Sequence, residues 1–120
     1  MPRFVVLRHD SPRGLHWDLM LEMGDVLKTW ALAQEPQPGR PCTAESLPDH
    51  RPAYLDYEGP ISGGRGHVTR WDHGTYTIQP PWEAKLSLAM SGKKLRGPVT
   101  LNRSAEAVTT WQFCWETPAQ

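Results

Sequence analysis

Two histidines and one aspartate near the start of the chain are spaced so that they could bind a metal ion. In "LHWDLML" (residues 15–21), the apolar and polar residues alternate, which is typical of a strand with one buried face. His16 and Asp18 then share the polar face, with Cα atoms roughly 6.6 Å apart. His9 ends the preceding apolar run, and "DSPRGL" can turn the chain back, so His9 is expected beside His16. Two imidazoles and one carboxylate suit manganese, iron or zinc and leave coordination positions open for water or a phosphoryl oxygen.

Other interpretations of the same residues remain open from spacing alone. His16 and Asp18 could form a solvated, hydrogen-bonded strand face without any metal. A His-x-Asp pair with a distant histidine is also the pattern of a facial-triad iron oxygenase, in which His67 or His73 would be the third ligand. Glu22 is expected as an exposed charge at the end of the strand.

The elements that must position these residues are short strands. Proline and glycine are abundant, with 12 and 10 residues, and no helix-length window has a sustained 3.6-residue apolar period. We therefore predict one all-β domain over residues 1–120, a compact barrel of about eight short strands with at most one or two helical turns. The expected strands cover residues 3–8, 15–21, 26–32, 53–59, 67–71, 75–79, 84–90, 95–103 and 109–115. Residues 67–79 are expected to form a hairpin around "DHG", and the Pro-rich residues 33–52 a long loop, with a helical turn near "TAESL" at most.

Composition limits the classes of partner. The chain has 13 basic and 13 acidic residues and a formal net charge of zero, which argues against tight non-specific binding to duplex DNA. Cys42 and Cys114 form neither a disulfide framework nor a CxxC metal site. The sequence contains no apolar run near the ~18 residues of a membrane span, so no membrane partner is expected and a cytoplasmic location is the default.

Several further side chains could bind or react with a phosphoester. His50 and Tyr54 lie four residues apart in "DHRPAY", where a histidine could act as a general acid and a tyrosine hydroxyl could orient a phosphate oxygen. Arg13 and Arg51 flank these groups in sequence and are the better candidates for phosphate contacts. Trp82, in "PPWE", could offer an aromatic platform for a base.

The order of the sequence blocks resembles a known family. "FVVLRHD", "LHWDLMLE", "VLKTWAL", "DHRPAYLDYEG", "RWDHGTYTI" and "LSLAMSGKKLRGPVTLNR" follow one another as in the 3′-phosphoesterase domain of bacterial DNA ligase D. The resemblance implies a β-barrel enzyme that uses a divalent metal, most often manganese although zinc or another transition metal would fit. Such an enzyme trims 3′ ends that carry a ribonucleotide or a phosphate during non-homologous end joining. Its implied partners are nucleic-acid 3′ ends and a separate ligase or polymerase.

The resemblance also assigns roles to individual residues. His9, His16 and Asp18 would hold the metal, and His50 and Tyr54 would join His16 as catalytic residues. The sequence departs from the family pattern at Met20, where the family has an arginine that contacts phosphate, and at Leu7, where it usually has glutamine. A thioether has no charge and no N–H donors, so a bidentate phosphate contact is lost at this position. The alternative function is therefore a degenerate barrel that binds a metal, a nucleic-acid end or a repair partner without turnover.

Overall fold

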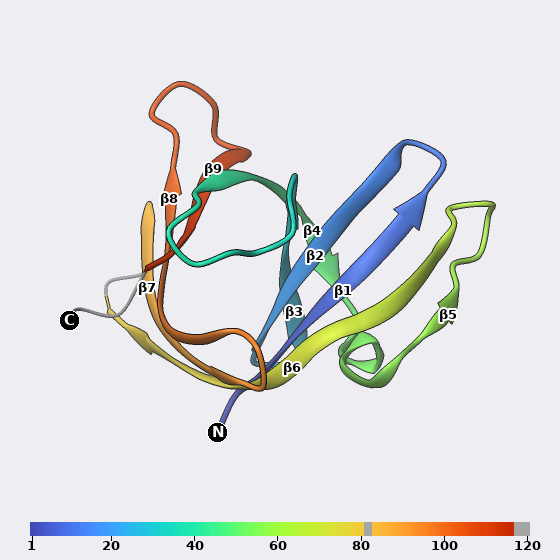
Figure 1. The fold of residues 1–120 in the computed structure, drawn as a ribbon, viewed down its shortest axis with the longest axis horizontal. Helices are drawn as coiled ribbons and strands as arrows, with labels where there is room; N and C mark the ends of the chain where they lie inside the picture. The colour runs from blue at the N-terminus through green and yellow to red at the C-terminus, as the bar shows by residue number, and fades with distance from the viewer. Residues whose placement is uncertain (81–82, 117–120) are drawn as a thin grey trace.

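The computed structural model describes residues 1–80 and 83–116, and Figure 1 shows their arrangement. The elements are β1 (Arg3–Ser11), β2 (Gly14–Met23), β3 (Val26–Leu32), β4 (Cys42–His50), the 3₁₀ helix η1 (Pro52–Asp56), β5 (Gly59–Pro60), β6 (His67–Gln79), β7 (Lys85–Gly92), β8 (Arg96–Arg103) and β9 (Thr110–Trp115).

The strands form a closed antiparallel barrel. Eight of them pair in the order β1-β2-β3-β4-β9-β8-β7-β6, and pairing between β6 and β1 closes the ring. The short β5 adds a ninth strand on β6. The prediction of an all-β barrel of about eight strands is thus confirmed, and closure leaves few unpaired sheet edges.

The barrel interior holds the main hydrophobic core. Alternate residues of β1 and β2, such as Phe4, Val6, Leu19 and Leu21, point inward and are almost fully buried. Figure 1 shows β7, β8 and β9 completing the wall opposite these strands. Burial of this inner face fixes the register of β1 against β2, because a one-residue slip would turn these inward-facing side chains to the outer face.

A second, smaller apolar cluster lies on the outside of the barrel. Val5, Leu7 and Met20 occupy the outer positions of β1 and β2, and they pack with Leu27, Leu55 and Val68. Helix η1 and the segment that leads through β5 to residue 66 cover this face (Figure 1). The outer face of β1 and β2 is therefore apolar beside η1 and polar toward the turn that joins the two strands, at His9, His16 and Asp18.

Side chains from the barrel hold η1 in place. The Arg70 guanidinium on β6 donates to the Leu55 carbonyl at 3.1 Å, and Arg3 on β1 forms an ion pair with Asp56 at 2.7 Å. The Arg3 guanidinium lowers the pKa of Asp56 below its usual value. These contacts connect η1 to both β1 and β6, so the covering segment is anchored at its helical end.

Two expectations about the middle of the chain are wrong. Residues 33–52 are not a continuous loop, because β4 takes up Cys42–His50 and "TAESL" is extended rather than helical. Its backbone pairs with β3 and β9, which the local sequence does not indicate. Residues 53–59 are not one strand, since Pro52 begins the 3₁₀ helix at a position where proline lacks only an unneeded N–H.

The expected hairpin over residues 67–79 is also wrong, because β6 is one continuous strand of 13 residues. Gly74 permits a close approach of strands rather than a turn. A Cβ atom there would lie 2.2 Å from the Ser91 carbonyl oxygen on β7. The hairpin over β7 and β8 and the last strand, β9, are as predicted.

Cys42 and Cys114 are free thiols. In the described part of the chain, no helix has the length and apolar character required to cross a membrane. The expectation for Trp82 concerns a residue outside the described ranges.

Candidate metal and phosphoester site

The register of β1 against β2 brings the three predicted ligands together. His9 lies directly opposite His16, and Asp18 lies opposite Leu7, two positions further along both strands. Because side chains alternate along a strand, all three point to the outer face of the barrel. The turn after Ser11 is short, and Gly14 reverses the chain with a φ of 120°. The tight turn and the buried inner face together fix the strand register, and this register places His9, His16 and Asp18 side by side.

The three side chains are close enough to share one cation. Nδ1 of His9 lies 3.0 Å from Oδ2 of Asp18, and Nε2 of His16 lies 3.1 Å from Oδ1. The two imidazole rings have centroids 4.6 Å apart. One ligand atom from each residue lies within 4.8 Å of the others. Atoms bound to one metal at ~2.0–2.2 Å are at most about 4.4 Å apart, so small side-chain movements would complete the site.

Asp18 is a buried carboxylate with an unsatisfied oxygen. Its residue is 3% exposed, and among the described residues its Oδ1 has no aligned hydrogen-bond donor, although Nε2 of His16 is near it. A buried acceptor without a partner costs about 1–3 kcal/mol, and more when it is charged. A cation between Asp18 and the histidines would remove this cost, so the residues present fit a divalent metal.

His9 is oriented by a second hydrogen bond. Its Nε2 lies 2.9 Å from the backbone carbonyl oxygen of Arg65. Because a carbonyl oxygen can only accept, Nε2 carries a hydrogen. Nδ1 faces Oδ2 of Asp18, so the proton that these two atoms share without a metal must leave before Nδ1 can bind one. Metal-binding histidines commonly donate their other ring N–H to a carbonyl or carboxylate in this way.

His16 is influenced by the same carboxylate. Its side-chain contact with Asp18 raises the pKa of His16 above the usual value, against the opposing effect of burial. The charged form is favoured because Asp18 provides a nearby negative charge. Since a metal binds only the unprotonated nitrogen, protons compete with the ion at this position.

The contribution of Arg65 was missed from the sequence. The glycine-rich "SGGRG" segment brings its carbonyl to His9, and Gly66 allows the approach. Gly66 has a φ of 88°, and a Cβ atom there would lie 1.9 Å from the Asp10 carbonyl oxygen on β1. A glycine-rich loop before a strand was the available signal, because glycine is required where two backbones approach this closely.

A small pocket of about 60 Å³ opens beside the cluster. His9 and Asp18 line one side, and His50 and Tyr54 line another, so the structure brings four of the predicted residues to one cavity. The remaining lining residues are mainly apolar: Leu7, Met20, Ile61 and Val68, together with Arg65. Met20 is only 2% exposed, so an uncharged floor occupies the position where the resemblance implied an arginine.

His50 and Tyr54 are held against each other at the edge of this pocket. Nδ1 of His50 lies 2.9 Å from the Pro48 carbonyl oxygen, which requires the hydrogen on Nδ1 and leaves Nε2 for a substrate. The two rings meet edge to face with centroids 5.5 Å apart. His50 ends β4 and Tyr54 lies in η1, so the pair depends on how that helix docks on the barrel.

The other candidates lie elsewhere. Arg51 lines an adjoining pocket with Tyr54, whereas Arg13 lies in the exposed turn between β1 and β2 and lines neither pocket. His73 pairs with Val5, four residues along β1 from His9, and His67 pairs with Asp10, whose side chain alternates to the other face. Neither histidine joins the cluster, so this geometry does not favour the iron-oxygenase arrangement.

Comparison with known proteins places this site in a family. The family described as "DNA Ligase D 3'-phosphoesterase domain" matches residues 7–103. The chain belongs to this family. The matched range begins just before His9 and includes all residues that line the pocket beside the cluster and the adjoining pocket with Arg51. The similarity to the family therefore extends over the candidate site as well as the barrel.

Curated relatives within the family are much longer proteins. The chain is 38% identical over 105 residues to the "Multifunctional non-homologous end joining protein LigD" of Pseudomonas aeruginosa, covering 79% of this chain and 12% of that protein. It is 29% identical over 110 residues to the "Multifunctional non-homologous end joining DNA repair protein LigD" of Mycobacterium tuberculosis, covering 84% and 14%. The chain thus corresponds to about one eighth of the length of these relatives.

Proposed function

We propose that this chain is a divalent-metal-dependent phosphoesterase that trims nucleic-acid 3′ ends carrying a terminal ribonucleotide or phosphate, in DNA end repair. The observation that supports it most is the cluster of His9, His16 and Asp18, which borders a pocket with His50 and Tyr54. Membership in the 3′-phosphoesterase family and the resemblance to end-joining proteins support the substrate class. Manganese is the ion proposed, and a separate ligase or polymerase is the proposed partner in repair.

Each residue has a distinct proposed task. His9, His16 and Asp18 would hold the ion, which when bound would polarise a phosphoryl oxygen. The Arg65 carbonyl orients His9 through its Nε2 hydrogen. His50, with Nδ1 fixed by Pro48, can exchange a proton at Nε2 with the leaving or attacking oxygen.

Tyr54 has a positioning task in this proposal. Its ring packs against His50, and its neighbour Tyr57 meets it edge to face at 5.8 Å. The Tyr54 hydroxyl is the polar group of this stack and can hydrogen-bond a phosphate oxygen. Arg51, one turn away at the start of η1, contributes positive charge to the adjoining pocket.

The experiment measures processing of defined 3′ ends. A 5′-labelled primer on a template, ending in one ribonucleotide or in a 3′ phosphate, is incubated with metal-stripped protein and then with Mn²⁺ or Zn²⁺. We expect shortening or dephosphorylation only with added metal, and a loss of about 10²-fold or more in His50→Gln if it transfers a proton. Absence of processing of both ends, with either ion, contradicts the proposal.

The second candidate function is binding without turnover, and the apolar floor favours it. Leu7 and Met20 place no charged side chain on the pocket floor, and the Arg65 guanidinium is already hydrogen-bonded to Ser62. A charged group that could stabilise phosphate in the transition state is therefore missing from the floor. Met20→Arg tests this alternative, with Met20→Leu as the control that keeps an apolar side chain. A degenerate barrel predicts that wild type and Met20→Leu are both inert and that Met20→Arg gains activity. Activity in the wild type rejects the alternative.

A further inference from the structure

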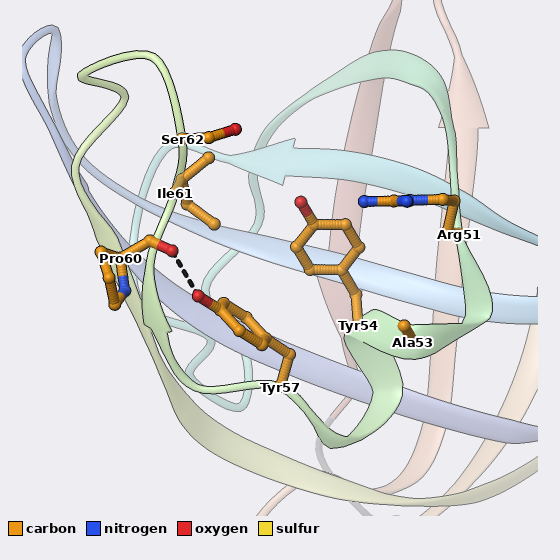
Figure 2. Close-up of a pocket in the computed structure, with 7 residues that line it drawn as sticks. All are labelled: Arg51, Ala53, Tyr54, Tyr57, Pro60, Ile61 and Ser62. Carbon is orange, nitrogen blue, oxygen red and sulfur yellow. Dashed lines mark hydrogen bonds between the residues drawn. The ribbon is translucent and has the colours of Figure 1, made fainter.

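A second pocket adjoins the one beside the metal cluster and is larger, at about 220 Å³ (Figure 2). It lies between η1 and the segment after β5. Its lining residues are Arg51, Ala53, Tyr54, Tyr57, Pro60, Ile61 and Ser62. We refer to these seven residues as the outer pocket.

The outer pocket is continuous with the site already described. Tyr54 and Ile61 line both cavities, so a ligand group beside His9 and Asp18 can extend past these two side chains into the outer pocket. Only the side chains of Tyr54 and Ile61 therefore separate the two cavities. This arrangement suits a substrate with a reacting phosphate attached directly to a second, bulkier group.

The chemistry of the outer pocket favours a flat aromatic group with hydroxyl groups. Tyr54 and Tyr57 provide ring surfaces, and the Tyr57 hydroxyl donates to the Pro60 carbonyl, which ties η1 to β5 (Figure 2). Figure 2 shows the Arg51 side chain extending toward the Tyr54 hydroxyl, with Ser62 on the opposite wall. Within the described ranges Arg51 has no ion pair with a carboxylate, so its charge remains available to a ligand.

The opposite wall is braced from behind. Nε of Arg65 donates to the Ser62 carbonyl at 2.7 Å, and its Nη2 donates to the Ser62 hydroxyl at 3.2 Å. The same Arg65 accepts from His9 through its carbonyl. One residue thus sets the spacing between the metal cluster and the wall of the outer pocket.

The size limits the occupant to one unit of a nucleic acid. Sites for drug-sized ligands measure ~300–1,000 Å³, so 220 Å³ accommodates a single nucleoside rather than a dinucleotide. We infer that the outer pocket holds the terminal nucleoside of a 3′ end, with its 5′-linked phosphate at His9, His16 and Asp18. This inference rests on the proposed function and adds to it the residues that recognise the leaving group.

The assignment gives each wall a role. The base stacks on one of the two tyrosine rings, because these rings meet at 81° and cannot both lie parallel to it. Such stacking tolerates any base sequence. The sugar hydroxyls face the Arg51 guanidinium and the Ser62 hydroxyl, which can supply hydrogen bonds. A 3′-phosphate end has no nucleoside beyond the reacting phosphate, so it leaves the outer pocket empty.

The test fills the outer pocket with aliphatic side chains that cannot stack. Ala53→Leu and Ser62→Leu extend from opposite walls, and both residues are exposed, so folding should be retained. The matched control is Ala89→Leu, an exposed position on β7 outside both pockets. Fluorescence anisotropy in chelator measures the affinity for two labelled strands, one ending in a ribonucleoside and one ending in a 3′ phosphate. The same strands are then processed with Mn²⁺.

We expect wild type and Ala89→Leu to bind the nucleoside end more tightly. In the double variant Ala53→Leu/Ser62→Leu, the ratio of the two affinities should fall by about tenfold, the effect of losing one stacked base. Equal weakening for both ends, or no change in either, overturns the inference. A ratio that shifts in binding while no strand is processed by wild type supports the outer pocket and rejects only the proposed catalysis.

Discussion

Replacing Asp18 with asparagine tests directly whether the cluster binds a metal. Asparagine keeps the size of the side chain but removes the charge and the anionic ligand between His9 and His16. In the wild type, Oδ1 of Asp18 lacks a hydrogen-bond partner among the described residues, and one ligand atom from each of the three side chains lies within 4.8 Å of the others. We therefore expect Asp18→Asn to lose most of its affinity for Mn²⁺ while the barrel remains folded.

The size of the effect follows from linkage between binding and folding. An ion present at about 100 times its dissociation constant stabilises the native state by about 2.7 kcal/mol. For a domain of this size, 1 kcal/mol shifts the melting temperature by about 4 °C, so the wild type should gain about 11 °C. A loss of about 100-fold in affinity leaves about 0.4 kcal/mol, or about 2 °C.

The assay is thermal unfolding of metal-stripped protein with and without Mn²⁺ at about pH 8, where few histidines are protonated. Asp25→Asn, at an exposed carboxylate in the turn after β2, is the matched control and should retain the full shift. An equal metal-dependent shift in Asp18→Asn and wild type would refute the assignment of Asp18 as a ligand. Absence of a shift in the wild type with manganese, zinc or iron would refute the metal site as a whole.

Two further changes test the close backbone approach at Gly66 and the buried Tyr76 in the barrel core. Gly66→Ala places a Cβ 1.9 Å from the Asp10 carbonyl oxygen. We expect the free energy of unfolding, measured with urea, to fall by at least about 2 kcal/mol, and Mn²⁺ to raise the melting temperature less than in the wild type. Gly64→Ala is the control, because φ there is 68° but the space around a Cβ is open. It should lose only the stability that backbone strain costs and should keep the Mn²⁺-induced rise in melting temperature. Burial raises the pKa of Tyr76 to about 12, and its hydroxyl donates to the Glu22 carbonyl at 2.6 Å. The unfolded tyrosine ionises first, near pH 10, so stability is lost as pH rises from 10 to 12, by up to about 2.7 kcal/mol. Tyr76→Phe should be about 1 kcal/mol less stable at neutral pH and lack this alkaline loss, and parallel pH profiles would contradict the reasoning.

The local pattern predicted the first hairpin and the cluster on it. Strict alternation in "LHWDLML" placed His16 and Asp18 on one face, and the turn signal placed His9 beside His16. The observed register pairs His9 with His16. These features depend on contacts between residues that are near in sequence, for which side-chain period and turn chemistry are sufficient. The pattern did not show that this face lies outside the barrel.

The middle of the chain was harder to predict for a physical reason. The strand Cys42–His50 contains proline and charged residues, and it forms because β3 and β9 provide backbone partners on both sides. Tertiary pairing overrides weak local preference in such segments. The sequence shows only that His50 and Tyr54 lie four residues apart, whereas the docking of η1 through its buried Leu55 and the Arg70 hydrogen bond decides where they point.

By itself, the sequence determined the all-β class, the family and the residues that we propose as metal ligands, because these follow from residue type, period and order. Tertiary structure decided which groups complete the site. The Arg65 carbonyl reaches His9 from 56 residues away in the chain, and the outer pocket exists only between two segments that the barrel holds apart. Such contacts depend on the closed ring of strands and on the close backbone approach at Gly66, neither of which a local pattern can encode.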